Sequence, residues 1–232
     1  MSELLPLFLN LTGRAVLLVG GGRVATAKLQ QLLAAGARVR VVAPEISEDI
    51  VAMAARDETP TVHTARRGFT PADLDGAWLV VAAATPEVNR QVAEVAETQR
   101  VFVNAVDDPA NASAFLSGVV RRDGVTLAIS TSGDAPALTS LLREGLDALL
   151  PRDLASWVWQ ARAERVAWRR DGVPMEQRKP RLLRALNAIY ATAEHAEPSE
   201  HSEQEAFAAS APSATDRGPH VPWLNAPEDS WL

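Results

Sequence analysis

The sequence predicts an α/β protein that opens with a parallel, doubly wound β-sheet. Short apolar segments, typical of strands buried on both faces, recur through the first 106 residues. Segments with the apolar spacing of helices separate them, and β-α-β units of this length imply a parallel sheet. In addition, three consecutive glycines at residues 20–22 directly follow the first strand.

Strands and helices alternate in order through this part of the chain. The first helix has an apolar stripe that includes Val24, Leu29 and Leu32, and Gly36 is suited to end it. Pro44 stops the second strand. Strands are predicted over residues 16–19, 38–43, 61–64, 76–85 and 101–106, and helices over residues 24–35, from about residue 47, and over residues 86–98.

The pattern changes beyond the fifth predicted strand. Residues 113–133 contain two strand-like runs on either side of Asp123-Gly124, a pair that strongly favours a hairpin. Helical patterns follow over residues 137–150 and 154–190, and the second is interrupted near residues 172–174. The last forty or so residues are rich in Ala, Pro, Ser, Glu and His without a sustained period, so we expect them to be disordered.

Length and composition exclude several classes of protein. The 232 residues suffice for one substantial domain and a smaller companion. Because the chain has no cysteine, disulfides, thiolate zinc sites and cysteine nucleophiles are excluded. No segment has the roughly 20 apolar residues of a membrane span, and the N-terminus lacks a signal-peptide pattern. We therefore expect a soluble, cytoplasmic protein that binds neither membranes nor nucleic acid.

The net charge of −6 is concentrated at the C-terminus. Residues 192–232 hold eight acidic residues and one basic residue, which leaves 22 basic and 21 acidic residues, or +1, in the remainder. Within that remainder, residues 152–184 carry nine basic and four acidic residues. This local excess either attracts a polyanionic ligand or forms a solvated helical face.

The glycine turn has the spacing of a dinucleotide-binding motif, G-x-G-x-x-G/A. Gly20 permits the tight turn, Gly22 lets the backbone approach a pyrophosphate, and Ala25 allows close packing of the helix on the strand. The N-terminus of the following helix directs its N–H groups and positive dipole end at the phosphates. The turn's position between a strand and an amphipathic helix favours dinucleotide binding over a glycine turn needed only for packing.

The end of the second strand lacks the carboxylate that commonly binds the adenosine ribose. Ala43 occupies that position, so the backbone around Pro44 and Glu45 is expected to hold the ribose. No arginine stands at the strand's end to bind a 2′-phosphate, which favours NAD over NADP. Thr85, at the end of another strand, either faces the ligand or simply ends the strand.

Asp107 is the candidate catalytic residue. It follows a predicted parallel strand, beside the expected nicotinamide crevice, where a carboxylate can accept a proton from a substrate undergoing oxidation. The alternative is that Asp107 caps a turn or helix. Asp108 precedes a proline and is more readily interpreted as a turn residue.

Five motifs, in this order and spacing, resemble one known family. They are "LLPLFLNLTGR", "VGGGRVATAK", "AAATPEVN", "VFVNAVDDPANASAF" and "AISTSGDAPAL". Over about residues 4–190 the chain resembles the precorrin-2 dehydrogenase/sirohydrochlorin ferrochelatase family, the dehydrogenase-chelatase module of siroheme synthases. The resemblance implies NAD-dependent oxidation of precorrin-2 to sirohydrochlorin. In many members it also implies insertion of Fe²⁺ as a substrate to give siroheme.

The resemblance also assigns roles to individual residues. It places dinucleotide contacts on Arg23 and Val24 and on the Pro44-Glu45 pair, and it makes Asp107 the essential acid, which could also hold iron transiently. A hydroxyl that is modified in some members falls on Thr131, where serine is replaced. The implied substrates are tetrapyrroles, which the arginine-rich helices could bind through their carboxylates.

The family's architecture implies a four-part division of the chain. A Rossmann-type NAD-binding domain would cover residues 1–112, and an α+β region that forms a homodimer would cover 113–150. A helical substrate domain would cover 151–191, and an acidic tail 192–232. The alternative function is an NAD(H)-sensing regulatory module without redox chemistry, which would not require Asp107.

Overall fold

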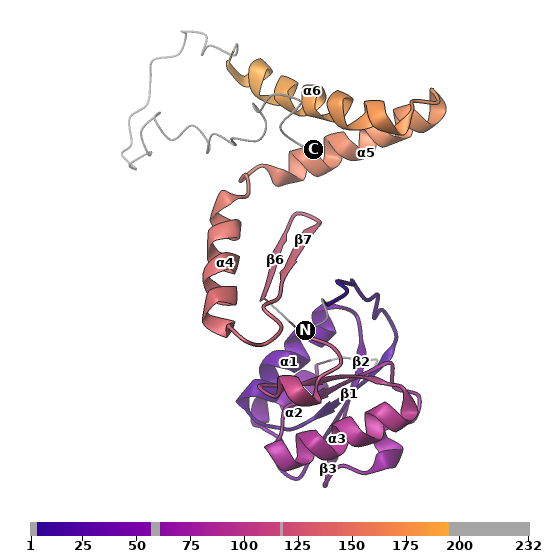
Figure 1. Cartoon of the computed structure of the whole chain (residues 1–232), viewed down its shortest axis with the longest axis vertical. Coiled ribbons are helices and arrows are strands. Elements are labelled where there is room, and N and C mark those ends of the chain that lie inside the picture. The colour runs from indigo at the N-terminus through magenta and orange to yellow at the C-terminus, as the bar shows by residue number, and fades with distance from the viewer. Residues whose placement is uncertain (1–3, 57–60, 117, 195–232) are drawn as a thin grey trace. The chain divides into compact units, whose positions relative to one another are not determined.

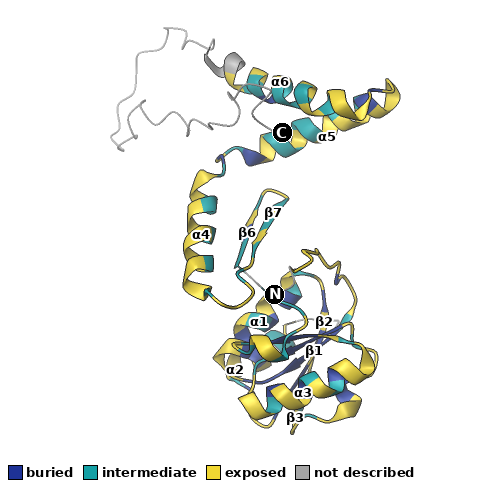
Figure 2. Ribbon diagram, in the orientation of Figure 1, coloured by how far each residue is buried: buried dark blue, intermediate teal, exposed yellow. Residues whose placement is uncertain are grey.

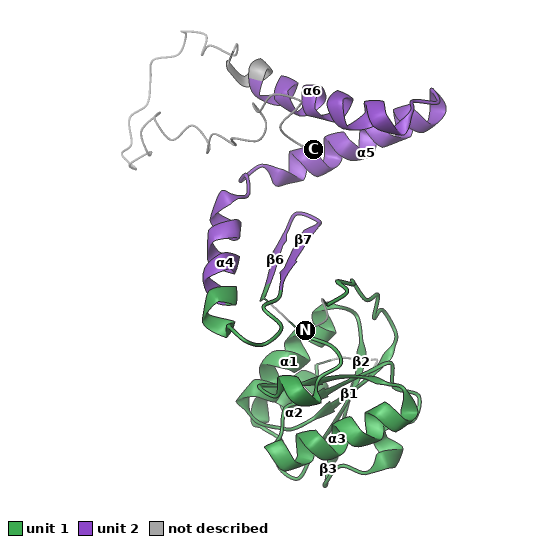
Figure 3. Cartoon of the chain, in the orientation of Figure 1, with its two compact units in different colours: residues 1–118, 130–139 green, residues 119–129, 140–232 purple. Residues whose placement is uncertain are grey.

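The computed structural model describes residues 4–56, 61–116 and 118–194 of the chain (Figure 1). The chain divides into two compact units, residues 1–118 with 130–139, and residues 119–129 with 140–232 (Figure 3). The acidic tail expected to be disordered lies outside the described residues from residue 195 onward. The four-part division of the chain and its cytoplasmic location stay predictions.

The first unit contains a five-stranded parallel sheet in the order β3-β2-β1-β4-β5. This confirms the predicted α/β class, and the order is that of the dinucleotide-binding fold. The strands are β1 (Ala15–Val19), β2 (Arg38–Ala43), β3 (Val62–Arg66), β4 (Leu79–Ala82) and β5 (Phe102–Ala105).

Helices cover both faces of this sheet. The α-helices are α1 (Arg23–Ala34), α2 (Glu48–Ala54) and α3 (Pro86–Gln99), and the short 3-10 helices are η1 (Pro71–Leu74) and η2 (Pro109–Asn111). α1 packs against β1 and β2, and α2 packs against β3. α3 packs against β4, β5 and η1. The sheet therefore lies between two helical layers.

Alternation along the strands divides the core into two clusters. Val16 and Leu18 of β1 pack beneath α1 with Leu29, whereas Leu17 and Val19 belong to the cluster on the opposite face. Successive side chains of a strand point to opposite faces, so a strand buried on both faces must be apolar throughout. The dark strands of the sheet in Figure 2 show this burial.

Beyond the sheet the chain forms a hairpin and three helices, and the second unit holds the hairpin from residue 119 and the helical residues from 140 onward. The hairpin strands are β6 (Gly118–Arg122) and β7 (Val125–Ile129), joined at the predicted Asp123-Gly124 pair. Both turn residues have positive φ, 49° and 85°, as a tight two-residue hairpin turn requires. The helices are α4 (Pro136–Leu149), α5 (Leu154–Arg170) and α6 (Met175–Glu194).

A polar contact joins α5 to α6. The Trp157 indole N–H donates to the Tyr190 hydroxyl at 2.7 Å, and that hydroxyl donates to the Asp153 carboxylate at 2.9 Å. The two rings also pack edge to face. Within the described ranges, no helix is long and apolar enough to cross a membrane.

Candidate cofactor-binding and catalytic site

Three connections of the first unit meet at the carboxyl ends of β1, β2 and β4. Gly20 N–H donates to the Val42 carbonyl of β2 at 3.0 Å, and Ser47 N–H donates to the Gly21 carbonyl at 2.9 Å. On the other side, Ala83 N–H donates to Val19 at 2.8 Å. The glycine turn is thus fixed between the loop after β2 and the loop after β4, where open α/β sheets bind ligands.

The three glycines of the turn have different roles. Gly20 has φ +127°, and a Cβ there would overlap the Ala83 carbonyl. A Cβ on Gly21 would overlap the Glu45 carbonyl. A Cβ on Gly22, by contrast, would meet no atom within 4 Å. The fold itself therefore requires Gly20 and Gly21, whereas Gly22 leaves space open at the surface of the turn.

The N-terminus of α1 borders this open space. Gly22 is the N-cap, no side chain forms a capping hydrogen bond, and the first turn has no acidic residue. Uncapped N–H groups together with the helix dipole favour an anionic ligand at this end. Ala25 is fully buried, as the motif's third small position requires. Arg23 and Val24 are exposed, so Val24, 44% exposed, does not join the packed stripe predicted for it.

The loop after β2 is fixed against the start of α1. Ala43 is buried at the strand's end, while Pro44 and Glu45 are exposed beside the glycine turn. The Thr26 and Ser47 hydroxyls lie 3.1 Å apart and hydrogen-bond each other, which joins the first turn of α1 to the N-cap of α2. This hydroxyl pair was not predicted from the sequence, although Ser47 before two acidic residues is a recognisable helix start.

Thr85 stands at the N-cap of α3, after β4. It is exposed, and its hydroxyl forms no hydrogen bond within the described ranges. Its backbone accepts from Asn89 N–H at 2.9 Å, and the buried Asn89 amide accepts from Ala84 N–H at 3.1 Å. Asn89 therefore fixes the loop, and the Thr85 hydroxyl is left available to a ligand.

Asp107 and Asp108 differ in what they contact. Asp107 is exposed two residues after β5, has φ +56°, and its carboxylate accepts no hydrogen bond from any described residue. The Asp108 carboxylate accepts from the Asn111 amide at 2.8 Å, so the turn interpretation fits Asp108.

Asn104 of β5 is a buried polar residue near the end of the same strand. It is 6% exposed, and its amide donates to the Ala114 carbonyl at 2.9 Å. Its buried Oδ1 has no partner in the described part of the chain.

Lys28 of α1 is a further charged group near Asp107. Burial lowers the pKa of the half-buried Lys28, and the negative charge of Asp107 partly opposes this shift. Within the described ranges the two side chains form no ion pair, so Asp107 acts on Lys28 only at longer range. Lys28 could not be recognised from the sequence, because a lone lysine on an amphipathic helix usually faces solvent.

Across the described ranges, no three His, Cys, Asp or Glu residues form a cluster that could hold a metal ion. Asp107 therefore belongs to no such cluster in this part of the chain. Its transient contact with iron stays a prediction.

The sheet order, the glycine turn and the uncapped helix define a Rossmann-type dinucleotide-binding domain. A family model described as "Putative NAD(P)-binding" matches residues 7–118. The chain is 47% identical over 155 residues to siroheme synthase 2 of Aeromonas hydrophila, covering 66% of this chain and 32% of that protein. It is 41% identical over 150 residues to the siroheme synthase of Neisseria meningitidis serogroup C, covering 64% and 31%.

One solved structure extends the likeness beyond the first unit. It is "SirC, precorrin-2 dehydrogenase", 26% identical with a TM-score of 0.59, and the match covers 77% of this chain and 87% of that one. The chain is thus similar to siroheme synthases and to a precorrin-2 dehydrogenase, and its residues 7–118 match an NAD(P)-binding family model. The matched region spans about a third of the length of the siroheme synthases.

Proposed function

We propose that this chain oxidises precorrin-2 to sirohydrochlorin, with NAD as the electron acceptor. The observation that supports this most directly is the open position at Gly22, beside the uncapped N-terminus of α1. It lies at the carboxyl ends of the strands, where Asp107 also follows its strand. The named activity of the relative SirC, which matches both units, supports the choice of substrate.

The residues present fit a bound NAD. The pyrophosphate would lie over Gly22 and the first amides of α1, with the exposed Arg23 and Val24 at its side. The backbone at Pro44 and Glu45 would hold the adenosine ribose. The Thr85 hydroxyl would face the nicotinamide half. When bound, NAD supplies the hydride acceptor.

Asp107 would take the proton that leaves the substrate. Oxidation of precorrin-2 removes a hydride and a proton, so the protein must supply an acceptor for the proton. The Asp107 carboxylate is exposed, and no described donor occupies its oxygens. It can therefore approach the substrate directly, as a general base must.

The basic helices of the second unit would bind the substrate's carboxylates. Arg162 and Arg165 of α5 and Arg184 of α6 are exposed, and none of them pairs with an acid in the described ranges. Guanidinium groups bind carboxylates through two parallel hydrogen bonds, which suits a polycarboxylate macrocycle.

We also propose that the chain forms a homodimer through residues 113–150. None of the 14 residues of α4 is buried, and Leu138, Leu141 and Leu142 are 43–65% exposed at helical spacing. An apolar helix face that the chain does not cover itself is typical of an interface. The yellow and teal colouring of α4 in Figure 2 shows this exposure.

The direct test supplies enzymatically prepared precorrin-2 to the purified chain, with and without NAD. We expect stoichiometric formation of NADH and sirohydrochlorin only when all three components are present. Absence of both products, with a chain that binds NAD, would instead support the NAD(H)-sensing module.

Ferrochelation needs a separate test, because Fe²⁺ is a substrate and two ring N–H protons must leave as it enters. The chain would be supplied with sirohydrochlorin and Fe²⁺ in the absence of NAD. Siroheme formation above the uncatalysed rate would establish the second activity. A rate equal to the uncatalysed rate would restrict the chain to oxidation.

A further inference from the structure

Strand β2 has an unusual composition for an internal strand of a parallel sheet. Such strands are normally apolar on both faces, because helices cover both. In β2, however, Arg38 and Arg40 alternate with the buried Val39 and Val41. Val39 and Val41 pack in the cluster beneath α1 and α2, so the two arginines stand on the opposite face. On that face α3 packs against β4 and β5, so the start of β2, where the two arginines stand, lies outside these contacts.

These arginines line a cavity of about 150 Å³ on the open part of the face. Arg40 pairs in register with Leu17 of β1 and with His63 of β3, so His63 shares its face. Asp73 and Asp75, in and just after η1, line the other side. The cavity also includes residues at the start of β1, such as Ala15, and thus lies toward the amino ends of the strands. The glycine turn is at their carboxyl ends.

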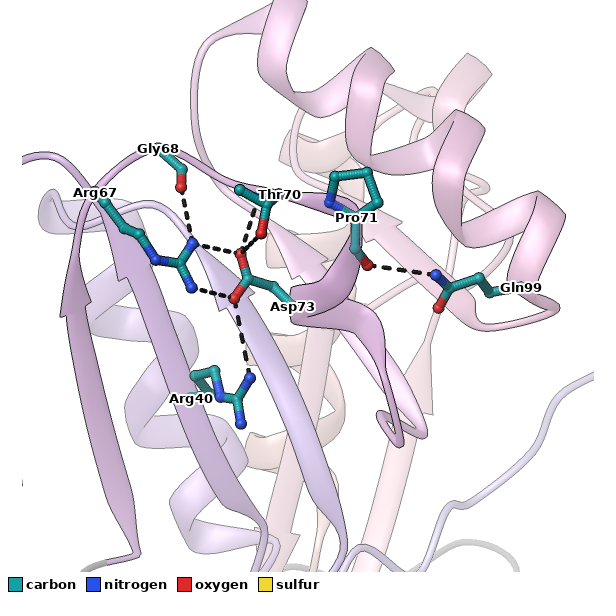
Figure 4. A network of polar contacts seen from close by, with 7 residues as sticks. All are labelled: Arg40, Arg67, Gly68, Thr70, Pro71, Asp73 and Gln99. Atoms are coloured by element: carbon teal, nitrogen blue, oxygen red, sulfur yellow. Dashed lines mark hydrogen bonds and ion pairs between the residues drawn. The ribbon is translucent and has the colours of Figure 1, made fainter.

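The acid deepest in this region, Asp73, is already neutralised. Arg67 donates two hydrogen bonds of 2.6 Å to its carboxylate (Figure 4). Thr70 donates two more, from its N–H at 2.9 Å and its hydroxyl at 3.0 Å. These contacts lower the pKa of Asp73 to about 2, and the hydrogen bonds from Arg67 make the largest contribution. Its charge is therefore committed to Arg67, and Arg40 stands 3.9 Å from it as a second, more distant cation.

The remaining donors of the cavity are available. Arg38 uses its Nε to donate to the Gly13 carbonyl at 3.0 Å, which leaves its two terminal nitrogens. Neither the Arg40 guanidinium nor the His63 ring has a hydrogen-bond partner within the described ranges. Arg67 neutralises Asp73, so the two other guanidinium groups, Arg38 and Arg40, outnumber the one remaining carboxylate of the cavity, Asp75.

We propose that this cavity binds a small oxyanion of the phosphate type, separately from the dinucleotide. The terminal nitrogens of Arg38 and the guanidinium of Arg40 would each contact the anion, and the His63 ring would donate a further hydrogen bond. Two guanidinium groups and an imidazole offer more donors than a single carboxylate can accept, whereas a phosphate has enough acceptor oxygens for all of them.

The test is a titration of the full chain with inorganic phosphate at constant ionic strength, followed by amide NMR shifts. Saturable shifts centred on residues 38–41 and 63 are expected. Arg40→Gln and, separately, Arg38→Gln should weaken binding at least tenfold. The second variant guards against a loss of binding caused by loosening of Asp73, because Arg38 does not contact that carboxylate. Arg121→Gln, an exposed arginine of the second unit, is the matched control and should change nothing.

Other outcomes would overturn the proposal. Phosphate could bind at the glycine turn, in which case shifts would centre on residues 22–25 and vanish in Gly22→Ser. A linear response that is equal in all variants would indicate only screening of surface charge. A titration with acetate in place of phosphate tests whether the cavity prefers a carboxylate. If acetate saturated the shifts at a lower concentration than phosphate does, the assignment of a phosphate-type ligand would be contradicted.

Discussion

Substitutions in the glycine turn separate what the fold requires from what the cofactor requires. Gly22→Ser places a side chain in the open space at the N-cap of α1. Serine is a favourable N-cap and glycine is only slightly poorer, so the free energy of unfolding should rise by a few tenths of a kcal/mol, roughly. The same side chain occupies the path of the pyrophosphate. NAD binding should therefore weaken about 100-fold, or about 3 kcal/mol.

Gly21→Ala is the matched variant one residue earlier. Its Cβ would overlap the Glu45 carbonyl, a backbone atom that can move only with the whole loop after β2. Overpacking of this kind costs about 1–3 kcal/mol, and a backbone obstacle favours the upper end. We expect the free energy of unfolding to fall by about 3 kcal/mol.

The assay combines urea unfolding with calorimetric titration of NAD for both variants and the parent chain. Stability and affinity should move in opposite directions for Gly22→Ser. The reasoning is refuted if Gly22→Ser binds NAD as tightly as the parent does, or if Gly21→Ala is as stable as the parent.

Three further predictions concern other parts of the chain. Because the pKa of Asp73 is lowered from 3.8 to about 2, its ionised form stabilises the fold above pH 3.8, and this contribution is lost as pH falls toward 2. This contribution of the ionised Asp73 amounts to about 2 kcal/mol. The difference in unfolding free energy between the parent and Asp73→Asn should therefore shrink as the pH falls from 3.8 toward 2. A difference that stays constant over this pH range would contradict the prediction. Tyr190→Phe removes the hydroxyl that joins Trp157 to Asp153. Urea unfolding should show a loss of about 1 kcal/mol in the stability of the second unit, with NAD affinity unchanged. A variant as stable as the parent would show that this contact does not stabilise the unit. Leu141→Glu should shift the mass measured by light scattering from dimer to monomer, whereas a parent chain that is already monomeric would exclude the dimer.

Much of the first unit could be predicted because its signals are local. Buried parallel strands are short apolar runs, and the glycine turn lies between one such run and a helix. The Asp123-Gly124 hairpin follows from turn chemistry alone. In contrast, β4 is shorter than the apolar run over residues 76–85, because strand length depends on the neighbours that pair with it.

The contacts that shape the site depend on residues far apart in sequence. Gly21 is required by the Glu45 carbonyl, and the hydroxyls of Thr26 and Ser47 meet only when α1 and α2 pack side by side. Lys28 comes near Asp107 only once β5 has joined the sheet. No local pattern reports such pairings, so they could not be predicted from one sequence.

The most direct test of the proposed mechanism separates binding from chemistry at Asp107. NAD affinity and the single-turnover rate of precorrin-2 oxidation would be measured for Asp107→Asn, with Asp108→Asn as the control. We predict unchanged NAD affinity and a rate reduced about 100-fold or more for Asp107→Asn, since general bases contribute on this scale. The control should stay within a few-fold of the parent rate. A parent-like rate in Asp107→Asn would contradict the account.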